Sequence, residues 1–144
     1  MDYKIAVVED NTMILQTIMI NLEKQGYDVK AFADGESLLK VLRKQIFDLI
    51  ILDILLPGIS GLELLDQLKD RGQFTPVLML TVKRDLQSKI KALETGADDY
   101  LLKPFHMREL LLRVGAILRR VHDQNTLQSA QHIIVNGYKI NLNT

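Results

Sequence analysis

The amino-acid sequence predicts an α/β fold, in which a doubly wound parallel sheet of five strands is followed by a short linker and a partial β-hairpin. Two features indicate this fold. Short runs of strand-forming apolar residues alternate with longer stretches whose apolar residues recur at helical spacing, which is typical of a parallel sheet covered by helices. Charged or hydroxyl side chains come directly after four of the runs, and such positions share the edge where α/β sheets bind ligands.

Five short runs are expected to form the strands, at 4–8, 28–32, 49–52, 77–80 and 99–102. The third run, Leu49 to Leu52, is wholly apolar, as a strand buried on both faces requires. The second is interrupted by Lys30, so we place it at an edge of the sheet.

The stretches between the strands predict helices at 12–25, 36–43, 61–69, 86–95 and 106–121. The first has aliphatic residues along one face, and Gly26 is its stop signal. Pro57-Gly58 and the following Gly61 predict a tight loop after the third strand.

The composition changes after Arg120, and we expect a domain at 1–121, a polar linker at 122–132 and a further unit at 133–144. In the last segment Asn136-Gly137 separates two apolar runs, which is the strongest short signal for a β-hairpin. An isolated hairpin is marginally stable in water. We therefore interpret this segment as the truncated start of a second domain.

The composition is that of an ordinary soluble protein, and it excludes several classes. The formal net charge is zero, which argues against a large nucleic-acid surface on this chain. The absence of cysteine excludes disulfides and thiolate metal sites and fits the reducing cytosol. The chain opens on no signal-peptide pattern and has no apolar run of membrane-spanning length. We therefore expect a cytoplasmic protein without membrane contact.

The candidate functional residues are Glu9, Asp10, Asp53, Thr81 and Lys103, each at the end of a predicted strand. Taken singly, some have ordinary explanations, because Asp10 could cap a helix and Lys103 could be a solvated lysine. Together they place three carboxylates, a hydroxyl and an ammonium group at one edge of the sheet.

Asp53 favours a metal-dependent site, because it ends the most apolar strand and is costly to bury without a partner. Grouped carboxylates repel one another, and a hard divalent cation such as Mg²⁺ removes that repulsion while keeping sites for water and phosphate oxygens. Lys103 could then hold a phosphate oxygen as a point charge, and the Thr81 hydroxyl could bond to the same group. The pattern predicts a phosphoryl-transfer site.

The motifs that carry this pattern are Val7-Val8-Glu9-Asp10, Leu52-Asp53-Ile54-Leu55-Leu56-Pro57-Gly58, Leu80-Thr81 and Gly96-Ala97-Asp98-Asp99-Tyr100-Leu101-Leu102-Lys103-Pro104-Phe105. From about residue 3 to 121 the chain resembles the receiver domain of two-component response regulators, a flavodoxin-like or CheY-like fold. The resemblance implies that a sensor histidine kinase phosphorylates Asp53. It also implies that Asp10, Asp53 and the Leu55 carbonyl hold Mg²⁺ or Mn²⁺, with Glu9 acting through water.

The resemblance further implies a conformational switch, in which Thr81 turns toward the phosphoryl group and Tyr100 moves into the vacated space. It implies a cis peptide bond before Pro104, which turns Lys103 into the site. Such a protein is a switch that catalyses only its own phosphorylation and dephosphorylation. Val82 departs from the family, in which this residue is commonly small, and we expect its bulk to shield the phosphoryl group from water.

The last predicted helix resembles that of the winged-helix (OmpR/PhoB) subfamily, whose members dimerise on phosphorylation and bind DNA through a C-terminal domain, here mostly absent. The residues expected at the dimer face are Lys89, Ile90, Leu93, Asp98, Asp99, Glu109, Leu112, Arg113 and Arg120. We expect Lys89 to pair with Glu109, Asp99 with Arg113, and Asp98 with Arg120, some across the dimer. The simpler alternative is a solvated helix face with an internal Glu109–Arg113 pair.

Two other functions are compatible with this architecture. An aspartate-nucleophile phosphatase would carry Asp-x-Asp at the end of a strand, but Ile54-Leu55 follows Asp53. A flavodoxin-like flavin protein would need a phosphate-binding loop after the first strand, where Glu9-Asp10 would repel a phosphate. Hydrolysis of general phosphate esters or a coloured protein would favour these alternatives.

Overall fold

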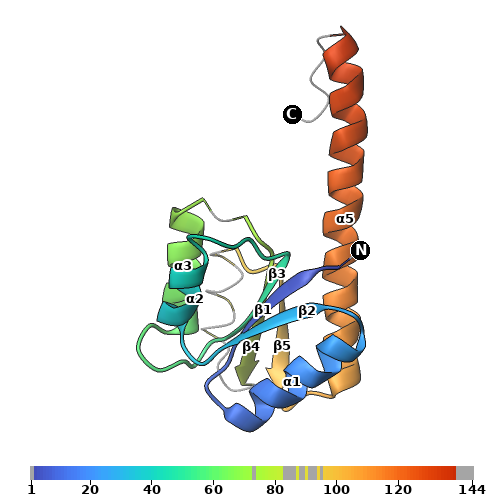
Figure 1. Ribbon diagram of the computed structural model, residues 1–144. Helices are drawn as coiled ribbons and strands as arrows, with labels where there is room; N and C mark the ends of the chain where they lie inside the picture. Colours follow the sequence, from blue (N-terminus) through green and yellow to red (C-terminus); the bar gives the residue numbers. More distant parts are fainter. Residues whose placement is uncertain are drawn as a thin grey trace.

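The protein forms a five-stranded parallel sheet covered by helices on both faces (Figure 1). The computed structural model describes residues 2–72, 74–82, 87, 90, 94 and 96–138, with side chains to residue 123. The strands are β1 (Lys4–Val8), β2 (Asp28–Phe32), β3 (Leu49–Asp53), β4 (Val77–Val82) and β5 (Asp99–Lys103). Their order is β2-β1-β3-β4-β5, which confirms the predicted fold class and places β2 at an edge.

The helices are α1 (Thr12–Lys24), α2 (Gly35–Val41), α3 (Gly61–Asp70) and α5 (Met107–Tyr138). The helix expected at 86–95 lies largely outside the described residues. In Figure 1, α2 and α3 cover one face of the sheet, and α1 and α5 cover the other. Strand β1 serves both, because Ala6 and Val8 pack toward α2 and α3 while Ile5 and Val7 pack toward α1 and α5.

Alternation of side chains along the buried strands produces two separate cores, one on each face. Strand β2 lies on one side of β1, and β3 lies on the other side, followed by β4 and β5. The direction in which the chain adds strands to the sheet therefore reverses, and the switch point lies between β1 and β3. A crevice forms at the carboxyl ends of the strands at such a switch point. The fold therefore creates a site at the ends of β1 and β3.

Short polar residues fix the starts of three helices. The Asn11 side chain accepts a hydrogen bond from the Ile14 backbone N–H at 3.1 Å, and Ser60 does the same for Glu63 at 3.2 Å. Asp34 caps α2 by accepting from the Ser37 N–H at 2.8 Å, and this bond lowers the pKa of Asp34. Because Asn11 caps α1, the neighbouring acidic residue Asp10 is not needed for that purpose.

The hairpin expected at 133–144 is not formed in its first half, and the segment expected as a linker is helical. Helix α5 continues without interruption through 122–132 and on through 133–138, including Asn136-Gly137 (Figure 1). The rest of the predicted hairpin, 139–144, lies outside the described residues. A strand needs a neighbour for its backbone groups, whereas a helix pairs them internally. None of the five described strands pairs with 133–138, so the helix is the conformation that satisfies this backbone.

The lengthened helix does not resemble a membrane segment. Within the described residues, no helix is both long enough and apolar enough to cross a bilayer.

Candidate functional site

Three carboxylates meet at the carboxyl ends of β1 and β3. Glu9, Asp10 and Asp53 each present one oxygen to a common point, and the three oxygens lie within 4.8 Å of one another. Glu9 and Asp53 are buried, whereas Asp10 is exposed at the opening. The Glu9 backbone N–H donates to the Phe32 carbonyl at 3.0 Å, which fixes the chain just beyond β1. The fold thus brings together the acidic residues that the sequence singled out.

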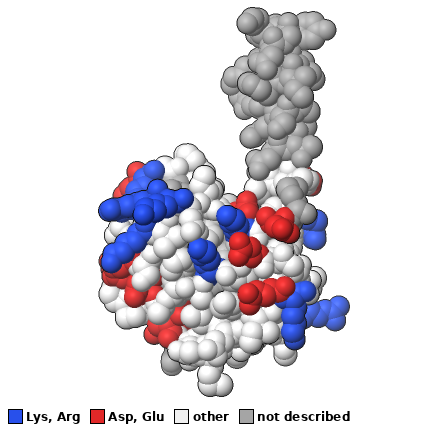
Figure 2. All heavy atoms as spheres, in the orientation of Figure 1, with Lys and Arg blue, Asp and Glu red and all other residues white. Residues whose placement is uncertain are grey.

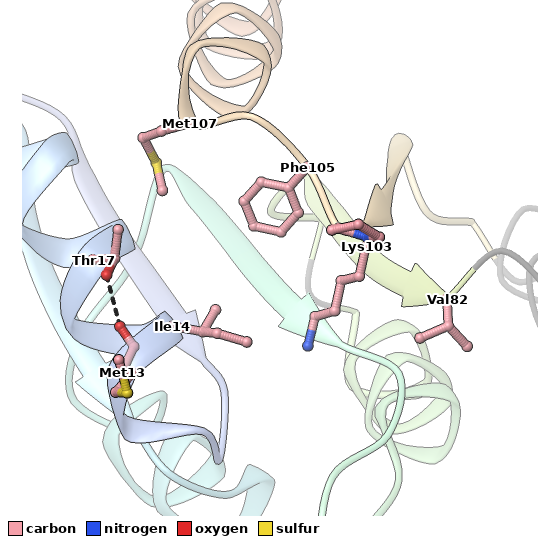
Figure 3. Close-up of a pocket in the computed structure, with 8 residues that line it drawn as sticks. Met13, Ile14, Thr17, Val82, Lys103, Phe105 and Met107 are labelled. Atoms are coloured by element: carbon pink, nitrogen blue, oxygen red, sulfur yellow. Dashed lines mark hydrogen bonds between the residues drawn. The ribbon is translucent and has the colours of Figure 1, made fainter.

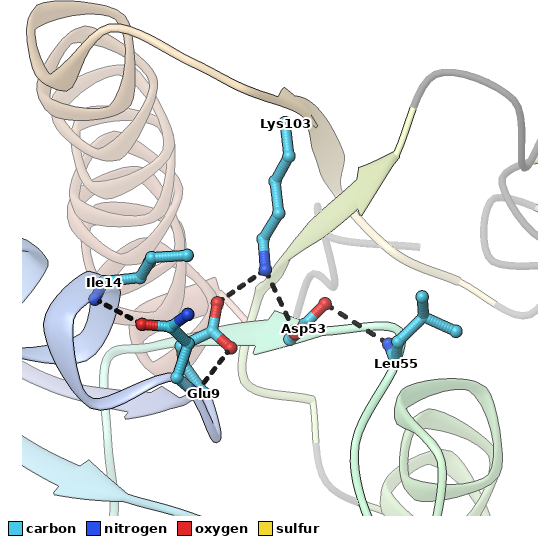
Figure 4. Close-up of polar contacts among 6 residues, drawn as sticks. Glu9, Ile14, Asp53, Leu55 and Lys103 are labelled. Atoms are coloured by element: carbon cyan, nitrogen blue, oxygen red, sulfur yellow. Dashed lines mark hydrogen bonds and ion pairs between the residues drawn. The ribbon is translucent and has the colours of Figure 1, made fainter.

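Lys103 supplies the positive charge of this cluster. From the end of β5, its Nζ donates to Glu9 Oε1 at 2.6 Å and to Asp53 Oδ2 at 3.1 Å (Figure 4). Burial of the ammonium group acts to lower the pKa of Lys103, but the bond to Glu9 and the charges of Asp53 and Glu9 outweigh it. The net effect raises the pKa of Lys103, so the side chain is a permanent cation here.

The donor set fits a hard divalent cation. Three carboxylates face one ammonium group, and no hydrogen bond or ion pair among the described residues reaches the Asp10 carboxylate. Asp10 is exposed to solvent, so water can complete a coordination shell. Carboxylates with water are the ligands that Mg²⁺ takes, and this cluster could hold a metal ion.

The loop after β3 is held against the site by a close contact at Gly61. The Gly61 N–H donates to the Ile54 carbonyl at 2.8 Å. A Cβ at this position would clash with the Asp53 carbonyl oxygen and lie 2.6 Å from Ile54 Cα. Only glycine allows α3 to begin so close to β3. The returning loop places the Leu55 N–H 3.2 Å from Asp53 Oδ1 (Figure 4).

A second restraint on this loop comes from α2. Glu36 Oε1 accepts a hydrogen bond from the Ile59 N–H at 3.1 Å. Gly58 lies beside the same carboxylate with a φ of 69°, in the left-handed region that favours glycine. Glu36 was missed by sequence reasoning, because a contact across 23 residues leaves no local pattern.

Thr81 and Val82 complete the edge between β3 and β5. Thr81 is buried, and its hydroxyl donates to the Val82 carbonyl at 3.4 Å. The register pairs Asp53 with Leu80 and Val82 with Lys103, so the end of β4 lies between the carboxylate and the ammonium group. Thr81 is therefore near the cluster, although its recorded bond is to the backbone.

The expected switch residue, Tyr100, lies in β5, and the expected cis peptide bond follows that strand. Tyr100 is half-buried and packs with Ala97 against the core on the α2 and α3 face. The peptide bond between Lys103 and Pro104 is cis, as expected.

A second, more exposed charged cluster joins β5 to α5. Arg113 Nη1 donates to Asp99 Oδ1 at 3.0 Å and to Oδ2 at 2.9 Å, and Arg113 Nη2 lies 3.5 Å from Glu109 Oε2. The hydrogen bond to Asp99 is the main reason that the pKa of Arg113 is raised. The Asp99–Arg113 pair is therefore made within one chain, together with the simpler Glu109–Arg113 pair.

The other residues expected at the dimer face agree with that expectation only in part. The Asp98 carboxylate accepts from the Val77 N–H at 2.7 Å, at the start of β4, and no Asp98–Arg120 pair forms within the described residues. Ile90 and Leu112 are exposed, as a contact surface requires. Lys89 and Leu93, and with them the Lys89–Glu109 pair, lie outside the described residues.

Comparison with known proteins decides the family. The model of the response regulator receiver domain matches residues 5–115. The chain belongs to this family. It is 47% identical over 120 residues to the alkaline phosphatase synthesis transcriptional regulatory protein PhoP of Bacillus subtilis, covering 83% of the chain and 50% of PhoP. It is 41% identical to the response regulator ArlR of Staphylococcus saprophyticus, covering 86% of the chain and 56% of ArlR.

Solved structures agree with this assignment. The receiver domain of the Francisella response regulator 1452 superposes with a TM-score of 0.78 at 34% identity, covering 83% of this chain and 98% of that one. DrrB of Thermotoga maritima, an OmpR/PhoB homologue, gives a TM-score of 0.74 at 40% identity, covering 83% of this chain and 54% of DrrB. The receiver assignment, with relatives of the OmpR/PhoB type, is confirmed. The chain spans about half the length of the curated relatives it matches.

Proposed function

We propose that this chain is the receiver of a two-component system, a cytoplasmic switch that accepts a phosphoryl group on Asp53 from a sensor histidine kinase. The observation that supports this most is the contact of Lys103 with both Asp53 and Glu9 beside a third carboxylate. Membership of the receiver family agrees with it. A buried group of like charges opposed by one cation is costly to maintain, and chemistry at the site accounts for its presence.

The metal in this proposal is Mg²⁺, which Mn²⁺ could replace. Asp10, Asp53 and the Leu55 carbonyl would hold it, and Glu9 would act through a bound water. When bound, it would neutralise charge on the oxygens of the transferring phosphoryl group.

The residues of the chain would perform the transfer by position and charge. A carboxylate oxygen of Asp53 forms the new bond to phosphorus while the bond from phosphorus to the donor atom breaks, and the electron pair leaves with the donor. The Leu55 N–H, 3.2 Å from Asp53 Oδ1, holds the plane of the carboxylate. Lys103 then contacts a phosphoryl oxygen, because its raised pKa keeps it charged. The Thr81 hydroxyl would bond to a second phosphoryl oxygen.

The output of the switch is also part of the proposal. Reorientation of Thr81 and Tyr100 would change the surface formed by β5 and α5, and two activated chains would then dimerise there. The relatives PhoP and PcoR are named transcriptional regulatory proteins, and the matched segments cover only 50% and 54% of their lengths. We therefore propose that DNA is bound by a winged-helix domain that begins at 133–144, after a connection at 122–132.

The similarity beyond the receiver supports this division. The ArlR of Staphylococcus aureus aligns over 147 positions and 96% of the chain, at 37% identity, which extends past residue 121. In the described residues both the connection at 122–132 and the residues 133–138 are the continuation of α5.

The proposal is tested by treating the protein with acetyl phosphate and Mg²⁺ and measuring its intact mass. We expect one phosphoryl group on the wild-type protein and none on Asp53→Asn, which keeps the side-chain shape but lacks the nucleophile. Omission of Mg²⁺, or Asp10→Asn at limiting Mg²⁺, should reduce labelling. A stable phosphoryl group on Asp53→Asn would overturn the assignment of the phosphoacceptor.

A further inference from the structure

An apolar pocket opens beside Lys103, separate from the acidic cluster. Its volume is about 500 Å³. Its walls come from the first half of α1, the end of β4 and the connection from β5 to α5 (Figure 3), and its lining residues are Met13, Ile14, Thr17, Val82, Lys103, Pro104, Phe105 and Met107.

Lys103 is the wall that the pocket shares with the phosphorylation site. Its side chain lines the pocket, while its Nζ bonds to Glu9 and Asp53. In Figure 3, Ile14 and Phe105 point toward this side chain from α1 and from the chain before α5. A donor whose phosphoryl group lies between Asp53 and Lys103 therefore borders this pocket along the Lys103 side chain.

The lining selects an apolar group. Apart from Lys103, the only side chain in it with a polar atom is Thr17, and the Thr17 hydroxyl donates its hydrogen to the Met13 carbonyl at 2.8 Å. The other side chains are aliphatic, aromatic or thioether groups. A polar leaving group would lose water here without gaining a donor, whereas a hydrocarbon chain would gain by leaving water.

We propose that this pocket is a subsite for the hydrocarbon chain of small acyl phosphates that phosphorylate Asp53 directly. The inference rests on the proposed function. In the step, an Asp53 oxygen bonds to phosphorus, the bond from phosphorus to the bridging oxygen breaks, and the donor leaves as a carboxylate with that electron pair. The chain of this carboxylate lies in the pocket, against Ile14 and Phe105, during the transfer.

The subsite makes the rate depend on the length of the donor. Complete burial of one methylene corresponds to about a fourfold gain in kcat/KM, and an open pocket gives a fraction of that. We expect kcat/KM for phosphorylation of the wild-type chain to rise about twofold to fourfold at each step from acetyl to propionyl to butyryl phosphate. Phosphoramidate, whose leaving group has no carbon, provides the reference rate for each variant.

Two matched variants introduce the same isoleucine-to-threonine substitution, one in the pocket lining and one outside it. Ile14→Thr puts a hydroxyl in the lining, and Ile20→Thr makes the same substitution on an exposed residue of α1 that does not line it. Met107→Gln is a second lining variant of nearly unchanged volume. Rates are measured by intact mass at fixed Mg²⁺, and each butyryl phosphate rate is divided by the phosphoramidate rate of the same variant.

We expect this ratio to fall at least about threefold in Ile14→Thr and Met107→Gln and to stay at the wild-type value in Ile20→Thr. Equal rates for the three acyl phosphates on the wild-type chain would overturn the subsite and leave the phosphoacceptor assignment standing. A length preference that survives both lining variants would also overturn it. No labelling by any donor, phosphoramidate included, would overturn the proposed function itself.

Discussion

Strand β5 carries an ion-pair cluster at each end, and the two differ in burial. At its carboxyl end, Lys103 is 18% exposed and contacts Glu9 and Asp53, which are 1% and 7% exposed. At its amino end, Asp99 is 24% exposed and contacts Arg113, which is 36% exposed. Both cations have a raised pKa because carboxylates surround them. The first cluster sets three carboxylates, two of them buried, against one cation, whereas the second sets two more exposed carboxylates, Asp99 and Glu109, against one cation.

This difference fits the two proposed roles, a site of phosphoryl transfer for the Lys103 cluster and a dimer contact for the Arg113 cluster. A buried charge that loses its partner costs several kcal/mol, whereas exposed pairs contribute about 0–1 kcal/mol each. The Lys103 cluster is therefore coupled to folding, and we expect a change in it to alter the stability of the protein together with the proposed phosphorylation. The Arg113 cluster can exchange partners at little cost, which suits a surface that pairs differently in the monomer and in a proposed dimer.

The largest expected effect comes from deleting each cation with the same substitution. Lys103→Met leaves Glu9 buried without its cation, and we expect the free energy of unfolding to fall by about 3 kcal/mol. Arg113→Met removes a half-exposed pair and should lower it by less than about 1 kcal/mol. Urea denaturation at pH 7 without divalent cations measures both.

The double variant Lys103→Met with Glu9→Gln provides the control. It removes the buried charge of Glu9, which Lys103→Met leaves without a partner, and should therefore restore part of the lost free energy of unfolding. Equal losses for the two single variants would mean that burial does not distinguish the clusters.

The next prediction compares one glycine at the buried site with one near the exposed cluster. Gly61→Ala places a methyl group against the Asp53 carbonyl, and we expect a loss of about 1–3 kcal/mol as the loop shifts. Gly115→Ala, within α5, meets only the end of the Arg119 side chain at 3.5 Å and should gain up to about 1 kcal/mol. Thermal unfolding should show melting temperatures that move in opposite directions. An unchanged melting temperature for Gly61→Ala would mean that the start of α3 can move away from β3 at little cost.

The third prediction concerns the proposed dimer. Arg113→Glu reverses the charge opposite Asp99, and it should keep the beryllofluoride-treated protein monomeric without preventing phosphorylation of Asp53. Arg119→Glu makes the same reversal on an exposed residue of α5 outside the expected face and should leave dimerisation intact. Sedimentation velocity measures both. A full dimer of activated Arg113→Glu would show that this face is not the interface.

The sequence was sufficient for the parts of the molecule whose patterns are local. Runs of apolar residues located all five strands, although β3, β4 and β5 extend beyond them to the site residues Asp53, Val82 and Lys103. A change from apolar to polar side chains does not end a parallel strand while its backbone still pairs with the neighbouring strand. The backbones of Val82 and Lys103 are still paired in this way. The acidic cluster was predictable for a related reason, because strand ends in a parallel sheet share an edge.

Contacts between distant segments that lie away from the strand ends of the site were not predictable. Nothing in the sequence indicates that Glu36 bonds to Ile59, or that Asp98 bonds to the start of β4 rather than to Arg120. The Asn136-Gly137 signal did not predict the local structure, because an isolated hairpin is only marginally stable in water and α5 continues through these two residues.

The smallest expected effect concerns Val82. It is paired with Lys103 in the sheet and lines the apolar pocket. We expect its branched side chain to leave little room for a water in line with a phosphoryl group on Asp53. Val82→Ala should therefore shorten the lifetime of phosphorylated Asp53 by about threefold, equivalent to ~0.6 kcal/mol of barrier. The decay of the phosphorylated mass after removal of the donor measures this lifetime, with Ile20→Ala as a control on exposed α1. An unchanged or longer lifetime would mean that water reaches the phosphoryl group by a route that Val82 does not block.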